Sequence, residues 1–125
     1  MTNIVVVFPR AEEARGIRGL LMRSGFHVTT VCTTGTQALS QMDDLGGGIV
    51  ISGYKFADMM YFELYESLPK GFEMLLIASD NHLQDCRESG ITCLAMPLKV
   101  QSLISTVTGM VENAERRKRR MREKP

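Results

Sequence analysis

The stretch "GGGIVISGYKF", Gly46 to Phe56, decides the fold. Its centre, Gly48–Ser52, is apolar and rich in β-branched residues without alternation, which is typical of a strand buried on both faces of a parallel sheet. Such sheets bind ligands and place their chemistry at the carboxyl ends of the strands. This strand ends in Ser52 and Gly53, so it offers no acidic residue at the place where chemistry is expected.

Similar apolar runs recur along the chain and alternate with segments of helical pattern. The predicted strands span residues 3–8, 26–32, 48–52, 73–79 and 92–96, and the predicted helices span residues 11–24, 34–45, 57–68 and 80–90, with a last helix from Val100. This alternation predicts an α/β protein: a (βα)5 doubly wound five-stranded parallel sheet, flavodoxin-like, with an extended C-terminal helix.

Composition indicates one globular domain. The chain has 125 residues, of which 44% are hydrophobic and 23% charged. Its cysteines, Cys32, Cys86 and Cys93, are odd in number and contain no C-x-x-C pair, so we expect free thiols in a reducing compartment. The first apolar run, residues 4–8, is too short for a signal peptide or a membrane span, which predicts a cytoplasmic protein without a membrane partner.

The charge is uneven along the chain. Residues 115–125 hold seven basic and two acidic side chains, whereas the rest of the chain has a net charge of −4. We therefore divide the chain into a domain at residues 1–112 and a basic helical linker or tail at residues 113–125.

The layout resembles the receiver domain of two-component response regulators over residues 3–112. The order of strands and helices fits, as do the segment "TTGTQAL" at residues 33–39 and the segment from Gly90 to Met96-Pro97. The resemblance implies an acidic pair after the first strand that binds Mg²⁺, and a phosphoacceptor aspartate at the end of the third. It also implies a hydroxyl residue after the fourth strand and a lysine before the proline of the fifth.

None of the charged groups of that site is present in this sequence. The acidic pair falls on Phe8 and Pro9, the phosphoacceptor on Gly53, the hydroxyl residue on Ala78 (or Ser79 after a shift of one residue), and the lysine on Met96. Pro97 remains, and the resemblance implies a cis peptide bond before it. We therefore expect a non-enzymatic pseudo-receiver without metal or cofactor, with Phe8 and Met96 filling the degenerate site.

A second resemblance is more specific. The segment "GGIVISGYKF", the following "M.YFEL" and the C-terminal "ENAERRKRRMREKP" are similar to the N-terminal domain of ANTAR-type transcription antitermination regulators. In that family a receiver or pseudo-receiver leads through a helical linker into a three-helix RNA-binding domain, which is absent from these 125 residues. The resemblance implies a phosphorylation-independent regulatory domain that positions an RNA-binding output.

Other candidate sites are weaker. Ser52 lacks the G-x-S-x-G pattern of a nucleophile and a patterned histidine partner, and His27 and His82 are expected at or near the surface. Asp80 leaves open a working phosphoacceptor that uses an atypical acid, although it also suits a helix N-terminus. The loop Tyr54–Phe56 either packs over the degenerate site or forms a docking patch, and we favour packing.

The basic tail has three interpretations: a solvated helix, a nucleic-acid contact or one strand of a coiled coil. The candidate nucleic-acid contacts are Arg116, Arg117, Lys118, Arg119 and Arg120. An apolar stripe in this helix includes Val100 and Ile104, and it continues past the length expected to cover the sheet. It predicts a weak homodimer, or a site for another protein, through Val107, Val111, Ala114 and Met121.

Overall fold

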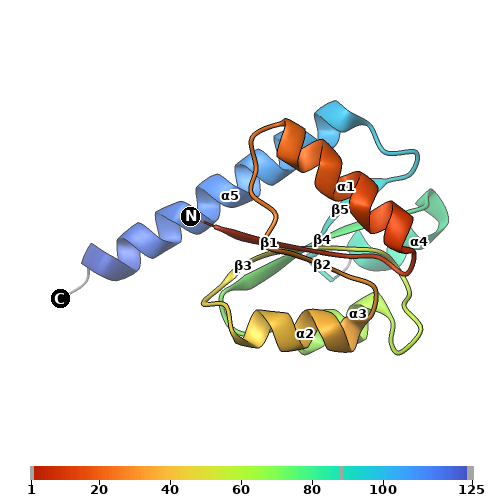
Figure 1. The fold of residues 1–125 in the computed structure, drawn as a ribbon, viewed down its shortest axis with the longest axis horizontal. Coiled ribbons are helices and arrows are strands. Elements are labelled where there is room, and N and C mark those ends of the chain that lie inside the picture. Colours follow the sequence, from red (N-terminus) through yellow and green to blue (C-terminus); the bar gives the residue numbers. More distant parts are fainter. Residues whose placement is uncertain (1, 88, 124–125) are drawn as a thin grey trace.

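Five parallel strands form the centre of the computed structural model, which describes residues 2–87 and 89–123 (Figure 1). The strands are β1 (Asn3–Val7), β2 (Thr30–Cys32), β3 (Gly48–Ser52), β4 (Phe72–Ala78) and β5 (Thr92–Ala95). They lie in the order β2-β1-β3-β4-β5. Every residue of β3 is buried, as the apolar run predicted.

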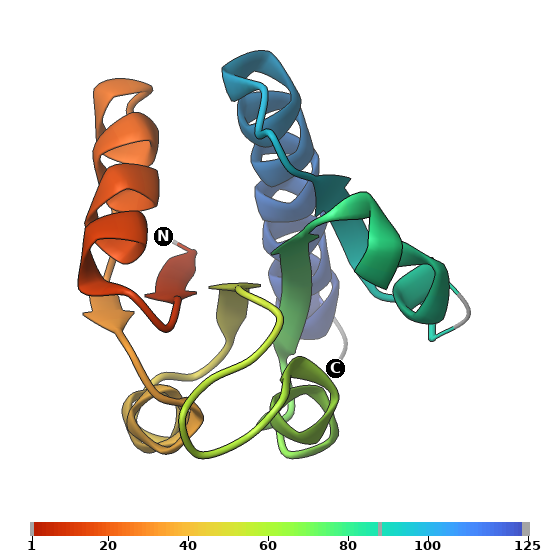
Figure 2. The ribbon, with the colours of Figure 1, turned by 90° about the vertical axis from the view of Figure 1, so that its right-hand side faces the viewer.

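The helices cover both faces of the sheet (Figure 2). They are α1 (Ala11–Arg23), α2 (Gly35–Asp43), α3 (Tyr61–Glu66), α4 (Asp80–Arg87) and α5 (Val100–Glu123). Helices α1 and α5 pack on one face, and α2, α3 and α4 pack on the other, which gives two hydrophobic cores. The predicted doubly wound (βα)5 fold is therefore confirmed.

Two elements are shorter than the sequence predicted. β2 begins at Thr30 rather than at Phe26, because the Phe26 amide donates to the carbonyl of Leu21 and closes the end of α1. α3 begins at Tyr61 rather than at residue 57, because the amide of Phe56 donates to the Met59 carbonyl and holds the preceding residues in a turn.

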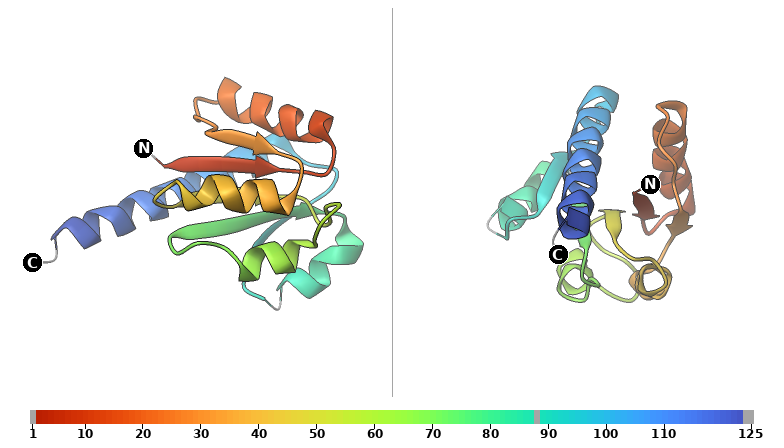
Figure 3. Two further views of the ribbon diagram at one scale, coloured as in Figure 1. Left: turned by 60° about the horizontal axis from the view of Figure 1, so that its bottom comes forward. Right: turned by 90° about the vertical axis from the view of Figure 1, so that its left-hand side faces the viewer.

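Helix α5 projects past the edge of the sheet (Figure 3). Its buried stripe is Leu103, Val107 and Met110. Val100, which we expected on this stripe, is 48% exposed. Ile104 is only partly buried and packs beside the stripe.

Helix α5 keeps its contacts with the sheet beyond Met110, further than its apolar stripe predicted. The Thr2 hydroxyl donates to the Glu115 carboxylate, and this hydrogen bond lowers the pKa of Glu115. The guanidinium of Arg117 pairs with the carboxylate of Glu73, at the beginning of β4. The amino edge of the sheet therefore holds α5 for almost two further turns, and the helix is continuous across the boundary predicted after residue 112.

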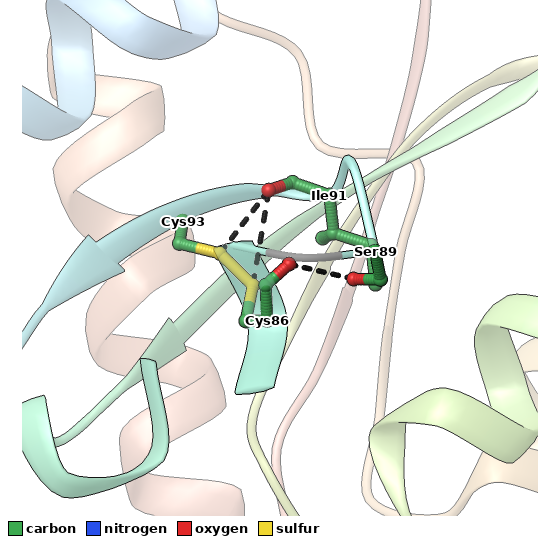
Figure 4. Close-up of a disulfide and its surroundings, with 4 residues drawn as sticks. All are labelled: Cys86, Ser89, Ile91 and Cys93. Carbon is green, nitrogen blue, oxygen red and sulfur yellow. Dashed lines mark hydrogen bonds between the residues drawn. A yellow bond between two sulfur atoms is a disulfide. The ribbon is translucent and has the colours of Figure 1, made fainter. Parts of the chain in front are cut away.

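The expectation of three free thiols is wrong for two of them. Helix α4 packs on the edge strand β5, which brings Cys86 next to Cys93, and the two form a disulfide (Figure 4). Both sulfur atoms face the carbonyl oxygen of Ile91, at 3.7 and 3.2 Å. Cys32 is free, and burial raises the pKa of its thiol. The cysteines thus give no argument for a reducing compartment.

Among the described residues, no helix is both long enough and apolar enough to cross a membrane.

Candidate functional site: the carboxyl edge of the sheet

The strand ends predicted from the sequence lie together at one edge of the sheet. Val7 lies opposite Ser52 in the pairing of β1 with β3, and the amide of Gly53 donates to the Val7 carbonyl at 3.0 Å. On the other side of the edge, the amide of Met96 donates to the Ala78 carbonyl at 2.9 Å. Backbone hydrogen bonds therefore fix the position of each strand end relative to its neighbour.

The ring of Phe8 lies against Gly53. Phe8 is only 4% exposed, and a Cβ added to Gly53 would lie 3.0 Å from Cδ1 of Phe8 and 3.2 Å from Cδ of Pro9. These distances are shorter than ordinary van der Waals contacts between carbon atoms. A side chain at position 53 would therefore require Phe8 and Pro9 to move by a few tenths of an ångström.

The Ser52 hydroxyl is bound within its own chain. Ser52 is fully buried, and its Oγ donates to the carbonyl oxygen of Gly53 at 2.8 Å. A reactive serine needs an exposed hydroxyl beside a base. This hydroxyl instead stabilises the turn by which the chain leaves β3.

Met96 does not fill the site as expected. Its side chain is 46% exposed and lines a cavity of about 500 Å³ on the α1 side of the sheet, together with Phe8. Of these two residues, only Phe8 is buried at the edge. Met96 is exposed because β5 is the outermost strand and the chain turns away after it. The Met96–Pro97 peptide bond is cis, the isomer that the receiver resemblance implies.

Polar groups near the edge do not gather into a metal site. Ala78 is buried, while Ser79 and Asp80 are exposed at the start of α4. Within the part of the chain that the structure describes, no group of three or more His, Cys, Asp or Glu residues is placed to hold a metal ion.

Aromatic side chains fasten the loop that follows β3. The Tyr54 ring stacks on the ring of His82 in α4, with centroids 3.8 Å apart and an angle of 20° between the planes. Tyr54 also lies 5.2 Å from the ring of Tyr61, and Phe56 is buried in the core under α2 and α3. Packing, the favoured interpretation of Tyr54 and Phe56, agrees with this arrangement, whereas Lys55 is exposed. His27 is exposed and His82 half-buried.

Asp58 is a residue that the sequence interpretation missed. Its carboxylate accepts hydrogen bonds from the amides of Gly35 and Thr36, at 3.0 and 2.9 Å, and from the Thr36 hydroxyl at 2.6 Å. The loop after β3 thereby binds the positive end of α2. The Thr36 hydroxyl, and to a smaller degree the backbone amides, lower the pKa of Asp58. A Cβ on Gly35 would overlap the side chain of Met59, so the glycine of "TTGTQAL" lets this loop approach.

The candidate dimer stripe is partly used within the molecule. Val107 is fully buried against its own sheet, and Val111 packs on the same core. Ala114 is half-buried beside Gly46–Gly48, where it lines a cavity of about 140 Å³. The side chain of Met121 lies outside the described residues. Val107, one residue of the stripe predicted from the sequence, is therefore not available to a partner.

The basic residues of α5 differ in their surroundings. Arg117 is engaged by Glu73, and Lys118 is half-buried. Arg117 is also exposed, and the exposed residues of the set for which no ion pair is found within the described part of the chain are Arg116, Arg119 and Arg120.

The contact between Phe8 and Gly53 predicts the effect of adding one methyl group. Gly53→Ala should lower the free energy of unfolding by about 1–3 kcal/mol, because the new Cβ must displace the Phe8 ring. In a Phe8→Ala background the same change should cost at least about 1 kcal/mol less. Urea unfolding of the four proteins measures this coupling. Gly46→Ala is the control, since its Cβ meets nothing within 4 Å. Equal costs in both backgrounds would contradict the contact.

The Asp58 carboxylate predicts a pH-dependent contribution to stability. Its folded-state pKa is lowered from the ordinary value of 3.8, so its contribution is present above pH 3.8 and is lost as the pH falls through the lower folded value. Asp58→Asn should cost about 1 kcal/mol at pH 7, and less at pH 3. Urea unfolding at both pH values tests this. Asp43→Asn, at the opposite end of α2, should be neutral or slightly stabilising. A cost for Asp58→Asn that does not change with pH would refute the assignment.

Solved structures similar to this chain are receiver domains. A CheY-like response regulator receiver domain protein from Methanospirillum hungatei JF-1 has a TM-score of 0.77 at 16% identity, covering 92% of this chain and 98% of that chain. The signal receiver domain of an HD domain-containing protein from Pseudomonas fluorescens Pf-5 has a TM-score of 0.79 at 20% identity, covering 95% and 93%. A two component transcriptional regulator AraC from Clostridium phytofermentans ISDg has a TM-score of 0.82 at 10% identity, covering 96% and 99%.

No protein-family model matches the sequence, and no curated protein matches it. At identities of 10–20% the similarity to solved structures establishes the fold alone. The conclusion from the strand order, the helix layers and these structures is that the chain has the receiver fold.

Proposed function

We propose that this chain is a pseudo-receiver: a non-enzymatic regulatory module of bacterial two-component-type signalling that works without phosphorylation. The observation that carries the proposal is the Phe8 ring against Gly53. Formation of an acyl phosphate needs a carboxylate at this strand end, whereas Gly53 has no side chain and the Phe8 ring lies 3.0 Å from the place where its Cβ would be.

The neighbouring positions support the same conclusion. Mg²⁺ prefers oxygen ligands, and the side chains of Phe8 and Pro9 supply none. Met96 stands where the receiver resemblance implies a lysine, and its thioether cannot neutralise a phosphoryl oxygen. The atypical-acid alternative rests on Asp80, which is exposed and stands at the first turn of α4, where a carboxylate is stabilised by the helix dipole.

We further propose that α5 positions an RNA-binding output in transcription antitermination, as the ANTAR resemblance implies. Two side-chain contacts, Thr2 with Glu115 and Glu73 with Arg117, hold the helix against the sheet well past Met110. A helix held in this way keeps a fixed direction relative to the domain. Direct nucleic-acid binding is a second candidate, favoured by the exposure of Arg116, Arg119 and Arg120.

The proposal predicts chemical inertness. Incubation with acetyl phosphate and Mg²⁺ should leave the mass of the intact protein unchanged, because no carboxylate stands at the end of β3. Gly53→Asp should remain inert, since Phe8 and Pro9 still supply no metal ligand. A gain of one phosphoryl group that Asp80→Asn removes would establish the atypical-acid alternative.

The projecting part of α5 predicts weak self-association, with Val111 and Ala114 as the described residues of the stripe that remain after Val107 is buried. Added salt should strengthen the dimer, because the Arg116–Arg120 charges repel across the interface and are screened within about 8 Å at physiological ionic strength. Sedimentation of the whole chain beside a chain ending at Lys118, which keeps the Arg117–Glu73 pair, tests this.

If both chains are monomeric across the micromolar range, the dimer proposal fails. Nucleic-acid binding has the opposite salt dependence, since it weakens as salt rises. A single-stranded RNA titration at two salt concentrations therefore separates the two roles of the tail.

A further inference from the structure

An apolar cavity of about 500 Å³ lies between α1 and the segment that joins β5 to α5. Its volume falls within the range of roughly 300–1,000 Å³ that is usual for small-molecule sites. Its apolar lining includes Phe8, Ile17, Leu20, Ile77, Met96 and Leu98. The cavity is thus lined by side chains from α1, from β4, from Phe8 directly after β1 and from the segment after β5.

A glycine in α1 lines this cavity. It is Gly16, which is exposed, and a Cβ at this position would meet nothing within 4 Å. A glycine inside a helix is less favourable than alanine. No close packing or positive backbone angle requires a glycine here. The lack of a side chain at Gly16 therefore leaves free space above Phe8 and Ile17.

The charges at the rim of the cavity favour an anion. Two charged side chains line it, Glu13 and Arg23. Glu13 is already paired with Arg10, at 3.8 Å. Arg23 folds back toward Gly19, and no ion pair is found for it within residues 2–87 and 89–123. An apolar pocket with one uncompensated guanidinium at its edge is complementary to a molecule with an apolar body and one negative charge.

We propose that this cavity binds a small amphipathic anion, whose apolar body rests on Phe8, Ile17 and Met96 and whose anionic group meets Arg23. The site is separate from the phosphorylation chemistry considered above, and it goes beyond the proposed function. It also reaches that edge of the sheet, because Phe8 both lines the cavity and touches the Gly53 position. Occupation of the cavity therefore bears directly on the side chain that closes the degenerate site.

Straight-chain carboxylates are suitable probes, with the amide and methyl NMR spectra of the whole chain as the readout. Affinity should rise about fourfold per added CH2 from butanoate to hexanoate to octanoate, as each methylene is buried. Octanoate should bind more tightly than 1-octanol, and octylammonium more weakly. The largest shifts should include the Phe8 ring and the Gly53 amide. No phosphodonor is present, so the result does not depend on the proposed function.

Two variants and one matched control locate the site. Gly16→Leu should weaken octanoate at least tenfold by filling the cavity, and it should fold well because leucine favours a helix. Gly109→Leu is the control, since Gly109 is also a helical glycine with nothing within 4 Å of its Cβ, and it lies on α5 outside the cavity. Arg23→Gln should weaken octanoate about threefold and leave 1-octanol unchanged.

Several results would overturn the proposal. They are the absence of saturable binding, equal effects of Gly16→Leu and Gly109→Leu, or the same affinity for octanoate and octylammonium. Octanoate binding that weakens as the protein concentration rises would show that a second copy fills the groove instead. Displacement of octanoate by vesicles of anionic phospholipid would identify a membrane lipid, rather than a free small acid, as the occupant.

Discussion

The parallel pairing of β1 with β3 is the constraint on which the carboxyl edge depends. It places Val7 opposite Ser52, and the residues that follow each strand must then share the same space. In this chain Phe8 and Gly53 lie so close together that a Cβ at position 53 would have to push the Phe8 ring aside by a few tenths of an ångström. The two residues therefore form one steric unit.

That unit has consequences on both sides of the edge. On the β3 side, the loop that follows Gly53 is fastened by the Tyr54–His82 stack and the Asp58 carboxylate. Toward α1, the Phe8 ring forms part of the wall of an apolar cavity. In this chain, the position that the receiver resemblance assigns to a metal ligand belongs to the hydrophobic core under α1 and α5.

The strands, the helices and their order were predicted from the sequence, because they depend on the spacing of apolar residues along the chain. Unbroken apolar runs specify strands buried on both faces, and their alternation with helices specifies the doubly wound sheet. The residue types at the strand ends, Phe8, Gly53 and Met96, could also be read directly from the sequence. The exposure of Met96 could not, since it follows from the direction of the chain after the edge strand β5.

Features that depend on contacts between distant segments could not be read from the pattern. Asp58 binds residues more than twenty positions away, and a lone aspartate in a loop carries no local signal of that role. Cys86 and Cys93 meet only because α4 packs on the edge strand. The stripe in α5 was assigned to a partner because a one-dimensional pattern does not show where a sheet ends, whereas Glu73 and Thr2 hold the helix beyond that point.

The packing at this edge also links the two strand ends. A side chain at position 53 would require Phe8 and Pro9 to move by a few tenths of an ångström, and an acidic residue at position 8 would be a charge within the buried layer below α1. Under the proposed pseudo-receiver function, a change at one strand end alone would therefore disturb this packing without supplying both metal ligands and a nucleophile. Only a simultaneous change at both strand ends would supply the two together.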